Sequence, residues 1–428
     1  MTQAVQQSSQ LLSMPPDVLT HVIAYTDRKT FDTLNCTCKT WNNEVLPSLN
    51  FTELLAGHLQ FSSIPQGTIT QKVYRDRTRR EQNLLNGIFS LKTLLPTTKL
   101  TDRPRGLALS NGKLFYGHNE NEAARIVELT NTKCLQTLKG HQGEALSLAA
   151  NDSQLCVCTK ETLKIWDVKT QQCTNTLQPT MGEVAAVAMA GNKLFYANAD
   201  AIGIYDLTNN EHLDTLNINK ICDIDNHGIM NSIAATEELL FIIPWQPASR
   251  PINIIDWRQK KRLGSFEGHT GACYIAVDDG KLFSRCLVGK SIKVWDIKTR
   301  ECLLTMDGAV GIGHTLLSSD GQLFYSENDG VMCMDFNAEH SAVFNELADL
   351  FDAASDDDVA QALKRFSKMP LAARKMIYAK HYEVLKKTKP AKEEDVKWAA
   401  DTFHNRNNAS STPAQKAAAI RMHTKMNT

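Results

Sequence analysis

Short apolar runs separated by polar turns recur along the middle of the chain at a nearly constant interval. A column of leucines marks these runs: Leu114, Leu155, Leu194, Leu239, Leu282 and Leu323. An acidic residue that follows an aromatic or large apolar one comes next in each repeat, at spacings of 39, 39, 50, 40 and 39 residues: Glu128, Asp167, Asp206, Asp256, Asp296 and Asp335. Short β-rich runs with a period near 40 residues predict a β-propeller with one four-stranded blade per repeat, because a lone blade cannot bury both of its faces.

A third column, of hydroxyl residues, predicts how the ring closes. Its members are Thr93, Thr137, Thr176, Thr215, Ser265 and Thr305. Thr93 precedes the first repeat and no member follows Asp335, although a ring needs its last blade completed so that no sheet edge stays open. We therefore predict that Phe89 to Leu95 supplies the outer strand of the final blade, whose inner strands come from about Ile312 to Phe336. The result is a mainly β ring of six blades over residues 88–340.

These repeats resemble the WD-repeat family. The resemblance rests on Ile165-Trp166-Asp167 and Val294-Trp295-Asp296, and on the turn pairs Gly140-His141 and Gly268-His269. Tyr205-Asp206 and Met334-Asp335 are weaker copies, and Asp256-Trp257 has the two residues in inverted order. Propellers of this family more often have seven blades, but the columns favour six. The resemblance implies a protein-binding ring in which the histidines stabilise turns.

A helical pattern precedes the ring at residues 11–50. Pro15-Pro16 suits a helix start, where the missing N–H groups cost nothing, and Asp17 suits its positive end. The segment resembles an F-box, the helical module that binds the small adaptor protein of cullin–RING ubiquitin ligases. Thr26 and Arg28 replace an expected leucine and proline. The resemblance implies that the adaptor contacts are Met14, Pro15, Val18, Leu19, Val22, Ile23, Phe31, Leu34 and Trp41. The alternative is a helical cap that packs on its own chain.

Helical or flexible segments are predicted for the remainder of the chain. We expect a disordered tail at 1–10, a helical linker at 51–87 with a helix from Thr70 to Asn86, a C-terminal helical region at 341–404 and a flexible tail at 405–428. The arginines of the linker, Arg75, Arg77, Arg79 and Arg80, are interpreted as a solvated helix face. From Val359 onward the chain contains 15 Lys or Arg and 5 Asp or Glu, which we interpret as a solvated helical bundle.

The loops that join second to third strands, and one blade to the next, emerge on one face of a propeller, the usual protein-binding face of this family. The long fourth repeat has part of its surplus at Pro244–Pro251, between its second and third strands. Trp245 and Arg250 on a proline-stiffened loop are favoured interface residues. We predict that they bind a substrate protein, with Arg105 and Arg285 adding positive charge. The alternatives are that Trp245 folds back onto its blade and that the arginines are ordinary surface residues.

Composition excludes several classes of function. Lys plus Arg and Asp plus Glu number 47 each, so no global charge favours nucleic acid. The eleven cysteines form no C-x-x-C pair, so we expect buried free thiols in a reducing compartment and no metal or other cofactor. No run of about 18 apolar residues indicates a membrane span. Phosphate-loop and hydrolase motifs are absent from the sequence, so we expect no enzymatic activity.

Together the two resemblances imply a non-catalytic substrate receptor of a cullin–RING ubiquitin ligase. The head would bind the cullin adaptor, and the propeller would bind a target protein. The alternative is a WD-repeat scaffold unrelated to ubiquitin, with the head as a structural cap. We expect a cytoplasmic or nuclear protein, or one acting in the host cytosol if the source is an intracellular bacterium.

Overall fold

The computed structural model describes thirteen stretches of the chain. They are residues 69–87, 89–96, 104–117, 122–129, 134–139, 143–179, 181–223, 232–243, 251–268, 273–286, 291–307, 315–327 and 330–337. The chain divides into two compact units, residues 1–85 and 86–428. The predicted F-box-like head with all nine adaptor contacts lies outside the described residues, as do Trp245, Arg250, His141, His269 and the regions 1–10, 341–404 and 405–428.

The linker helix predicted from Thr70 to Asn86 is present as α5 (Gln71–Asn86). Its start is stabilised by Thr70, whose hydroxyl accepts a hydrogen bond from the Val73 N–H at 3.3 Å. Arg79 forms an ion pair with Asp76 one turn earlier, at 2.8 Å. The solvated-face interpretation is wrong for Arg80, which is buried together with the neighbouring Glu81. Charge alternation alone did not show which face of the helix is covered.

The second unit contains, in its described part, six four-stranded antiparallel sheets. Blade 1 is β2 (Leu107–Ser110), β3 (Lys113–Tyr116), β4 (Glu122–Glu128) and β5 (Cys134–Lys139). Blade 2 is β6 (Ser147–Ala150), β7 (Gln154–Cys158), β8 (Leu163–Asp167) and β9 (Cys173–Leu177). Blade 3 is β10 (Ala186–Ala190), β11 (Lys193–Ala197), β12 (Ala201–Asp206) and β13 (Glu211–Asn217). A short helix, α6 (Ile218–Cys222), follows β13.

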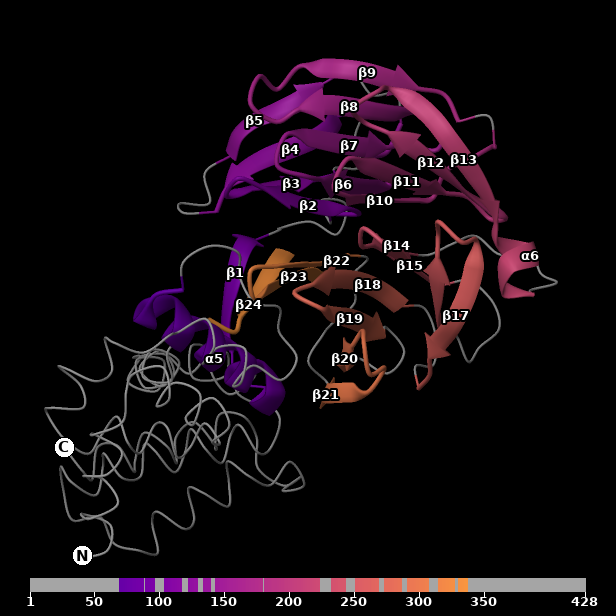
Figure 1. Ribbon diagram of the computed structural model, residues 1–428. Helices are drawn as coiled ribbons and strands as arrows, with labels where there is room; N and C mark the ends of the chain where they lie inside the picture. The colour runs from indigo at the N-terminus through magenta and orange to yellow at the C-terminus, as the bar shows by residue number, and fades with distance from the viewer. Residues whose placement is uncertain are drawn as a thin grey trace, which may run out of the picture. The chain divides into compact units, whose positions relative to one another are not determined.

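Blades 4 to 6 complete the ring (Figure 1). Blade 4 is β14 (Ser232–Ala235), β15 (Leu239–Ile243), β16 (Ile252–Asp256) and β17 (Lys261–Phe266). Blade 5 is β18 (Cys273–Asp278), β19 (Lys281–Cys286), β20 (Ser291–Asp296) and β21 (Cys302–Asp307). Blade 6 is β22 (Leu316–Ser319), β23 (Gln322–Glu327), β24 (Gly330–Asp335) and β1 (Ser90–Pro96). The first strands of successive blades contact one another around the ring, and β22 contacts β2.

The sixth blade confirms the predicted ring closure. β1 pairs antiparallel with β24, so the strand order is β1-β24-β23-β22. Phe89, just before β1, is fully buried and stacks edge-on against Phe336, with ring centroids 5.7 Å apart. A strand from the start of the ring thus covers the edge that the last three strands would leave open.

Apolar clusters between neighbouring blades hold the ring together. Phe115 of blade 1 packs with Leu148 and Trp166 of blade 2, and comparable clusters join blades 2 to 3, 3 to 4, 4 to 5 and 6 to 1. The cysteines Cys156, Cys158, Cys222, Cys286 and Cys333 are buried free thiols, as predicted. Cys173 and Cys302 are exposed, contrary to the prediction, because each begins an outermost strand.

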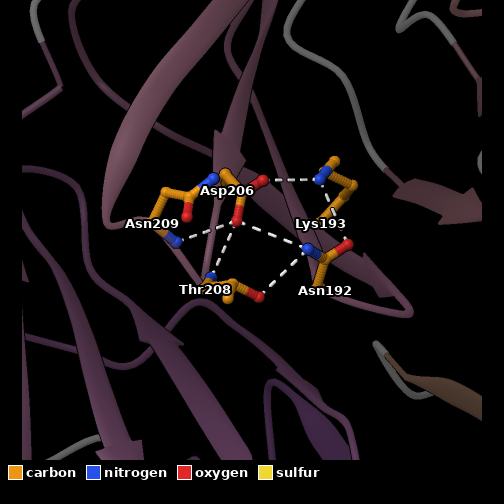
Figure 2. A network of polar contacts seen from close by, with 5 residues as sticks. All are labelled: Asn192, Lys193, Asp206, Thr208 and Asn209. Atoms are coloured by element: carbon orange, nitrogen blue, oxygen red, sulfur yellow. Dashed lines mark hydrogen bonds and ion pairs between the residues drawn. The ribbon is translucent and has the colours of Figure 1, made fainter.

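The acidic column stabilises the turn between the third and fourth strand of a blade. Asp206 Oδ1 accepts hydrogen bonds from the Thr208 and Asn209 N–H groups, and Asp206 Oδ2 pairs with Lys193 at 2.7 Å (Figure 2). The fourth residue after the aspartate has a positive φ in four blades: Gln171, Asn210, Lys260 and Arg300. The aspartate side chain thus accepts hydrogen bonds from the backbone N–H groups of a tight turn, which explains why an aspartate recurs at this position.

The strand register corrects one detail of the predicted repeats. Leu240, not Leu239, belongs to the leucine column, because Leu239 lies opposite Asp256 just as Lys193 lies opposite Asp206. The unbroken apolar run of β15 gave no cue for choosing between them. Trp257 of the inverted pair contacts the neighbouring blade, stacking edge-on against Phe195 at a centroid distance of 5.4 Å.

Candidate protein-binding face of the propeller

A central channel passes along the innermost strands of all six blades. Its volume is about 650 Å³, and its walls come from β2, β6, β10, β14, β18 and β22 with the residues just before them. Hydroxyl groups stabilise the walls across blades: Ser147 accepts a hydrogen bond from the Val187 N–H, and Ser232 accepts one from the Ile275 N–H. These serines are therefore used in joining blades.

The loops predicted to bind protein emerge at one end of the blades, and blade 4 has the longest of both kinds. Residues 218–231 connect β13 to β14, and residues 244–251 connect β15 to β16. Because strands alternate in direction, both connections lie at the same end of the ring. The surplus of the 50-residue repeat is thus divided between two segments of one face, which we call the loop face. Trp245 and Arg250 belong to the second segment, and their role in binding a substrate protein stays a prediction.

The first of these segments begins with the helix α6, which the sequence analysis did not predict. Asn217 caps the helix by accepting a hydrogen bond from the Lys220 N–H at 2.9 Å, while Ile218 and Cys222 are buried. The Asn219 side chain donates to Asp200, in the loop between β11 and β12, at 2.8 Å. The insertion therefore starts from an ordered base on blade 3, beside β13 (Figure 1).

Arg105 lies on the loop face, just before β2, as the sequence predicted. Its side chain is 45% exposed and pairs with Glu144, which precedes β6, at 3.1 Å. Arg105 also lines the mouth of the channel. This placement is compatible with a role in binding, although Glu144 neutralises part of its charge.

Arg285 is not a surface residue, and its predicted role in substrate binding is corrected. The side chain is fully buried, and Nη1 donates at 3.0 Å to two carbonyl oxygens of blade 6, those of Thr315 and Ser326. Its guanidinium lies over the Tyr325 ring, 5.2 Å from the centroid. Arg285 thus joins blade 5 to blade 6 and cannot contact a partner protein.

Burial and the neighbouring groups have opposite effects on the pKa of Arg285. Burial lowers the pKa of the guanidinium, and the neighbouring Tyr325, Glu327 and Tyr274 oppose that shift. Burial also raises the pKa of the Tyr325 hydroxyl well above its usual value, and Glu327 adds to the effect. The Tyr325 hydroxyl is therefore neutral at ordinary pH, and the Arg285 guanidinium is a cation because arginine does not lose its proton in proteins.

The sequence contained a signal for this burial that the prediction missed. Arg285 is the fourth residue after Lys281, which lies opposite Asp296. The residue at the same position of the other five blades is small or apolar: Gly117, Cys158, Ala197, Ile243 and Ser326. A column of such residues indicates a position that faces the next blade. The arginine was assigned to the surface from its charge alone.

The described residues offer no other chemistry at this face. They contain no group of three or more His, Cys, Asp or Glu that could hold a metal ion. No helix in the described part of the chain is long and apolar enough to cross a membrane.

A comparison with protein-family models supports the resemblance of the ring to WD-repeat proteins. Residues 132–167, from the outer strand of blade 1 to the third strand of blade 2, match the family model described as WD domain, G-beta repeat. The chain is thus a β-propeller protein that contains a WD repeat. WD propellers are in general non-catalytic interaction domains, in agreement with the expectation that the chain is not an enzyme.

Two solved structures are similar to this chain at low sequence identity. The structure of U3-55K is 14% identical with a TM-score of 0.45, over 57% of this chain and 83% of that one. The WD40 β-propeller domain of Doa1 is 18% identical with a TM-score of 0.44, over 54% of this chain and 77% of that one. No curated protein matches the sequence.

Proposed function

We propose that this chain is a non-catalytic substrate-recognition subunit of a cullin–RING ubiquitin ligase. Residues 11–50 bind the cullin adaptor, and the loop face of the propeller binds the target protein. The observation that carries the proposal is the combination, in one chain, of an F-box-like helical pattern with a closed six-bladed ring. The contribution to ubiquitin transfer is proximity, because holding the target near the transferring enzyme makes the encounter local.

The ring supports the target-binding half of the proposal. Its rigid blades present two long connections on one face at blade 4, and the second contains Trp245 and Arg250. Aromatic and arginine side chains dominate the binding energy of protein interfaces. Without an adaptor contact, the same face would serve a WD-repeat scaffold unrelated to ubiquitin, and the head would be a structural cap.

The first experiment measures binding of the purified protein to the cullin adaptor. A variant with Leu19→Asp and Val22→Asp places two charges on the predicted apolar stripe, and the control variant, Thr20→Asp and His21→Asp, places them beside it. We expect the first variant to lose at least about 100-fold in affinity, since each buried charge costs several kcal/mol. The control should bind like the wild type, and all three proteins should show the same propeller melting transition.

Two results would refute the ligase proposal and leave the scaffold. One is no adaptor binding by the wild type, and the other is equal binding by the stripe variant. Target binding is examined separately by chemical crosslinking in cells. Partners that crosslink to the wild type but not to a Trp245→Ala, Arg250→Ala variant identify the target, and unchanged crosslinking removes these two residues from the interface.

A further inference from the structure

Blade 4 has an unusual density of positive charge at the end opposite the loop face. The turn after β16 and the start of β17 have the sequence Arg258-Gln259-Lys260-Lys261-Arg262, and all five residues are exposed. The equivalent turn of blade 2 contains one lysine, Lys169, and that of blade 3, residues 207–210, contains none. The equivalent turn of blade 5 contains two cations, Lys298 and Arg300. The charge is therefore concentrated on blades 4 and 5 and is not a property of the repeat.

Most of this charge is not neutralised by the protein. Lys260 pairs with Asp214 of blade 3 at 2.6 Å. Arg262 donates only to neutral groups, from Nε to Asn253 Oδ1 at 2.8 Å and from Nη2 to Ser265 Oγ at 3.2 Å. Lys261 has no carboxylate partner within the part of the chain that the structure describes. Ser265 Oγ in turn donates to the Glu267 carboxylate at 2.8 Å, so one acidic group lies near Arg262 without pairing with it directly. Arg262 is thus held in position while keeping donors for a ligand.

Arg258 is positioned by an aromatic ring. Its guanidinium lies 5.0 Å from the centroid of Trp257, and that ring is itself fixed against Phe195. An arginine stacked on a ring keeps its in-plane donors available for hydrogen bonds. The turn therefore presents a second preorganised guanidinium.

Blade 5 adds a further cation to the same strand. Gly264 in β17 has a φ of +148°, and a Cβ atom there would lie 2.6 Å from Arg300 Nη1. The missing side chain gives the exposed Arg300 guanidinium room to lie against β17. Arg300 also has no carboxylate partner among the residues described. Arg300 therefore lies on the face of β17 that is turned toward blade 5, whereas Arg262 pairs with Ile255 and lies on the face turned toward blade 3. An added strand presents its side chains alternately to these two faces.

We propose that Arg258, Lys261, Arg262 and Arg300, here called the basic rim, form a docking surface for an acidic protein segment in an extended conformation. β17 is the outermost strand of its sheet, so its outer edge can pair with the backbone of an added strand. The arginine forks suit carboxylates, and Leu263, which is 37% exposed, offers an apolar contact between them.

An acidic peptide fits the rim better than nucleic acid does. Duplex binding typically uses about 6–10 phosphate contacts, and single strands stack on exposed aromatic rings. The rim has four cations, and the neighbouring aromatic ring of Trp257 is partly buried against blade 3. The rim follows β17 and contains none of the residues that the proposed function assigns to adaptor or target binding, so the inference does not depend on that function.

Fluorescence anisotropy with a short labelled peptide of Asp, Glu and Leu tests the basic rim. The test variant is Lys261→Glu with Arg300→Glu. The control is Lys92→Glu with Lys169→Glu, two exposed lysines of blades 6 and 2 that lie away from the loop face and give the same change in net charge. We expect the wild type and the control to bind alike, and the rim variant to bind at least about tenfold more weakly. A second variant, Lys261→Gln with Arg300→Gln, should also weaken binding while its melting transition stays that of the wild type.

Three results would overturn the proposal. They are no peptide binding by the wild type, equal loss in the rim and control variants, and unchanged binding by the glutamine variant. Parallel titrations use a single-stranded oligonucleotide and vesicles containing phosphatidylserine. Tighter binding of either one than of the peptide, lost in the same rim variant, would also overturn it, since the partner would then be a different class of molecule.

Discussion

Gly203 illustrates how closely side chains fill the third blade. A Cβ atom at this position would lie 2.2 to 2.5 Å from two ring atoms and the hydroxyl oxygen of Tyr196. Tyr196 lies on the neighbouring strand, is buried, and its hydroxyl hydrogen-bonds to His212 at 3.0 Å, so the ring has little freedom to move. We expect Gly203→Ala to destabilise the propeller by about 1–3 kcal/mol, the usual cost of overpacking. Urea unfolding monitored by circular dichroism measures the change.

A second background separates the steric clash from a general intolerance of strand residues. In a Tyr196→Leu protein the smaller side chain leaves space, so adding Gly203→Ala should cost clearly less than in the wild type. An equal cost in both backgrounds would show that the clash with the ring is not the cause.

Asp206 provides a pH dependence of known sign. Its hydrogen bonds from Lys193 and from the turn N–H groups lower the pKa of the carboxyl. A carboxyl whose pKa is lower in the folded state stabilises the fold above its unfolded pKa, and this contribution is lost as the pH falls through the folded value. We expect Asp206→Asn to lower stability at neutral pH and to match the wild type more closely below about pH 4. Urea midpoints across an acid pH series measure this.

An exposed aspartate at the end of the ring opposite the loop face, where Asp206 also lies, serves as the control. Asp152 lies in a turn between first and second strands, and its side chain makes no hydrogen bond or ion pair with another described residue. Asp152→Asn should leave the pH profile near that of the wild type. A neutral-pH loss of equal size in both variants would contradict the assigned role of Asp206.

At the residue scale the sequence predicted the positions of the repeat but not all of their surroundings. The acidic column was found at the right residues, yet its role in the turns depends on backbone N–H groups that no sequence pattern shows. Arg285 was misplaced because its partners are carbonyl oxygens of another blade. Contacts between blades join residues far apart in the chain, so the sequence of a single repeat does not show them.

The closing strand β1 is the element on which the ring depends most directly. Phe89 anchors its start, fully buried against Phe336. We expect Phe89→Ala to cost about 3–5 kcal/mol, the range for removing a buried phenylalanine side chain. Chemical unfolding of the full chain measures the loss.

Lys92 offers a matched control on the same strand. It is exposed, and Lys92→Ala should change stability by less than about 0.5 kcal/mol, as surface substitutions usually do. Similar losses in the two variants would mean that strand pairing, and not the Phe89 anchor, determines the stability of the closure.

At the element scale the strands and their pairing were largely predictable, since apolar runs and turn residues repeat with a fixed period. The offset of Thr93 predicted the closure because it left one strand over at the start of the ring. The helix α6 was missed because its five residues are too few to show a helical period. Its stability comes instead from the Asn217 cap and from the bond between Asn219 and Asp200.

At the scale of the whole molecule, blade 4 combines the two features that distinguish this ring from a regular repeat. Its loop-face connections are the longest, and its opposite end has the basic rim. Both are departures from the pattern of the other blades, and neither is needed to close the ring. Blade 4 could therefore serve two partners, a target at its loop-face connections and an acidic segment along β17.

Closure makes the propeller a single cooperative unit, and Arg285 allows that to be tested. Each blade of a closed ring has two neighbours, so weakening one seam should lower the stability of all six blades. Arg285→Ala leaves the Thr315 and Ser326 carbonyls without this donor and opens a cavity between blades 5 and 6. We expect a loss of about 3 kcal/mol or more. Arg105→Ala, which removes an exposed arginine from an ion pair with Glu144, should cost less than about 1 kcal/mol.

Hydrogen exchange read by mass spectrometry shows whether the loss spreads around the ring. In Arg285→Ala, amides of β7 in blade 2 should exchange faster by a factor similar to that for β19 in blade 5, because both exchange through opening of the whole ring. Faster exchange confined to blades 5 and 6 would contradict this expectation. The propeller would then open seam by seam, and a partner bound at the loop face could stabilise one part of the ring without the remainder.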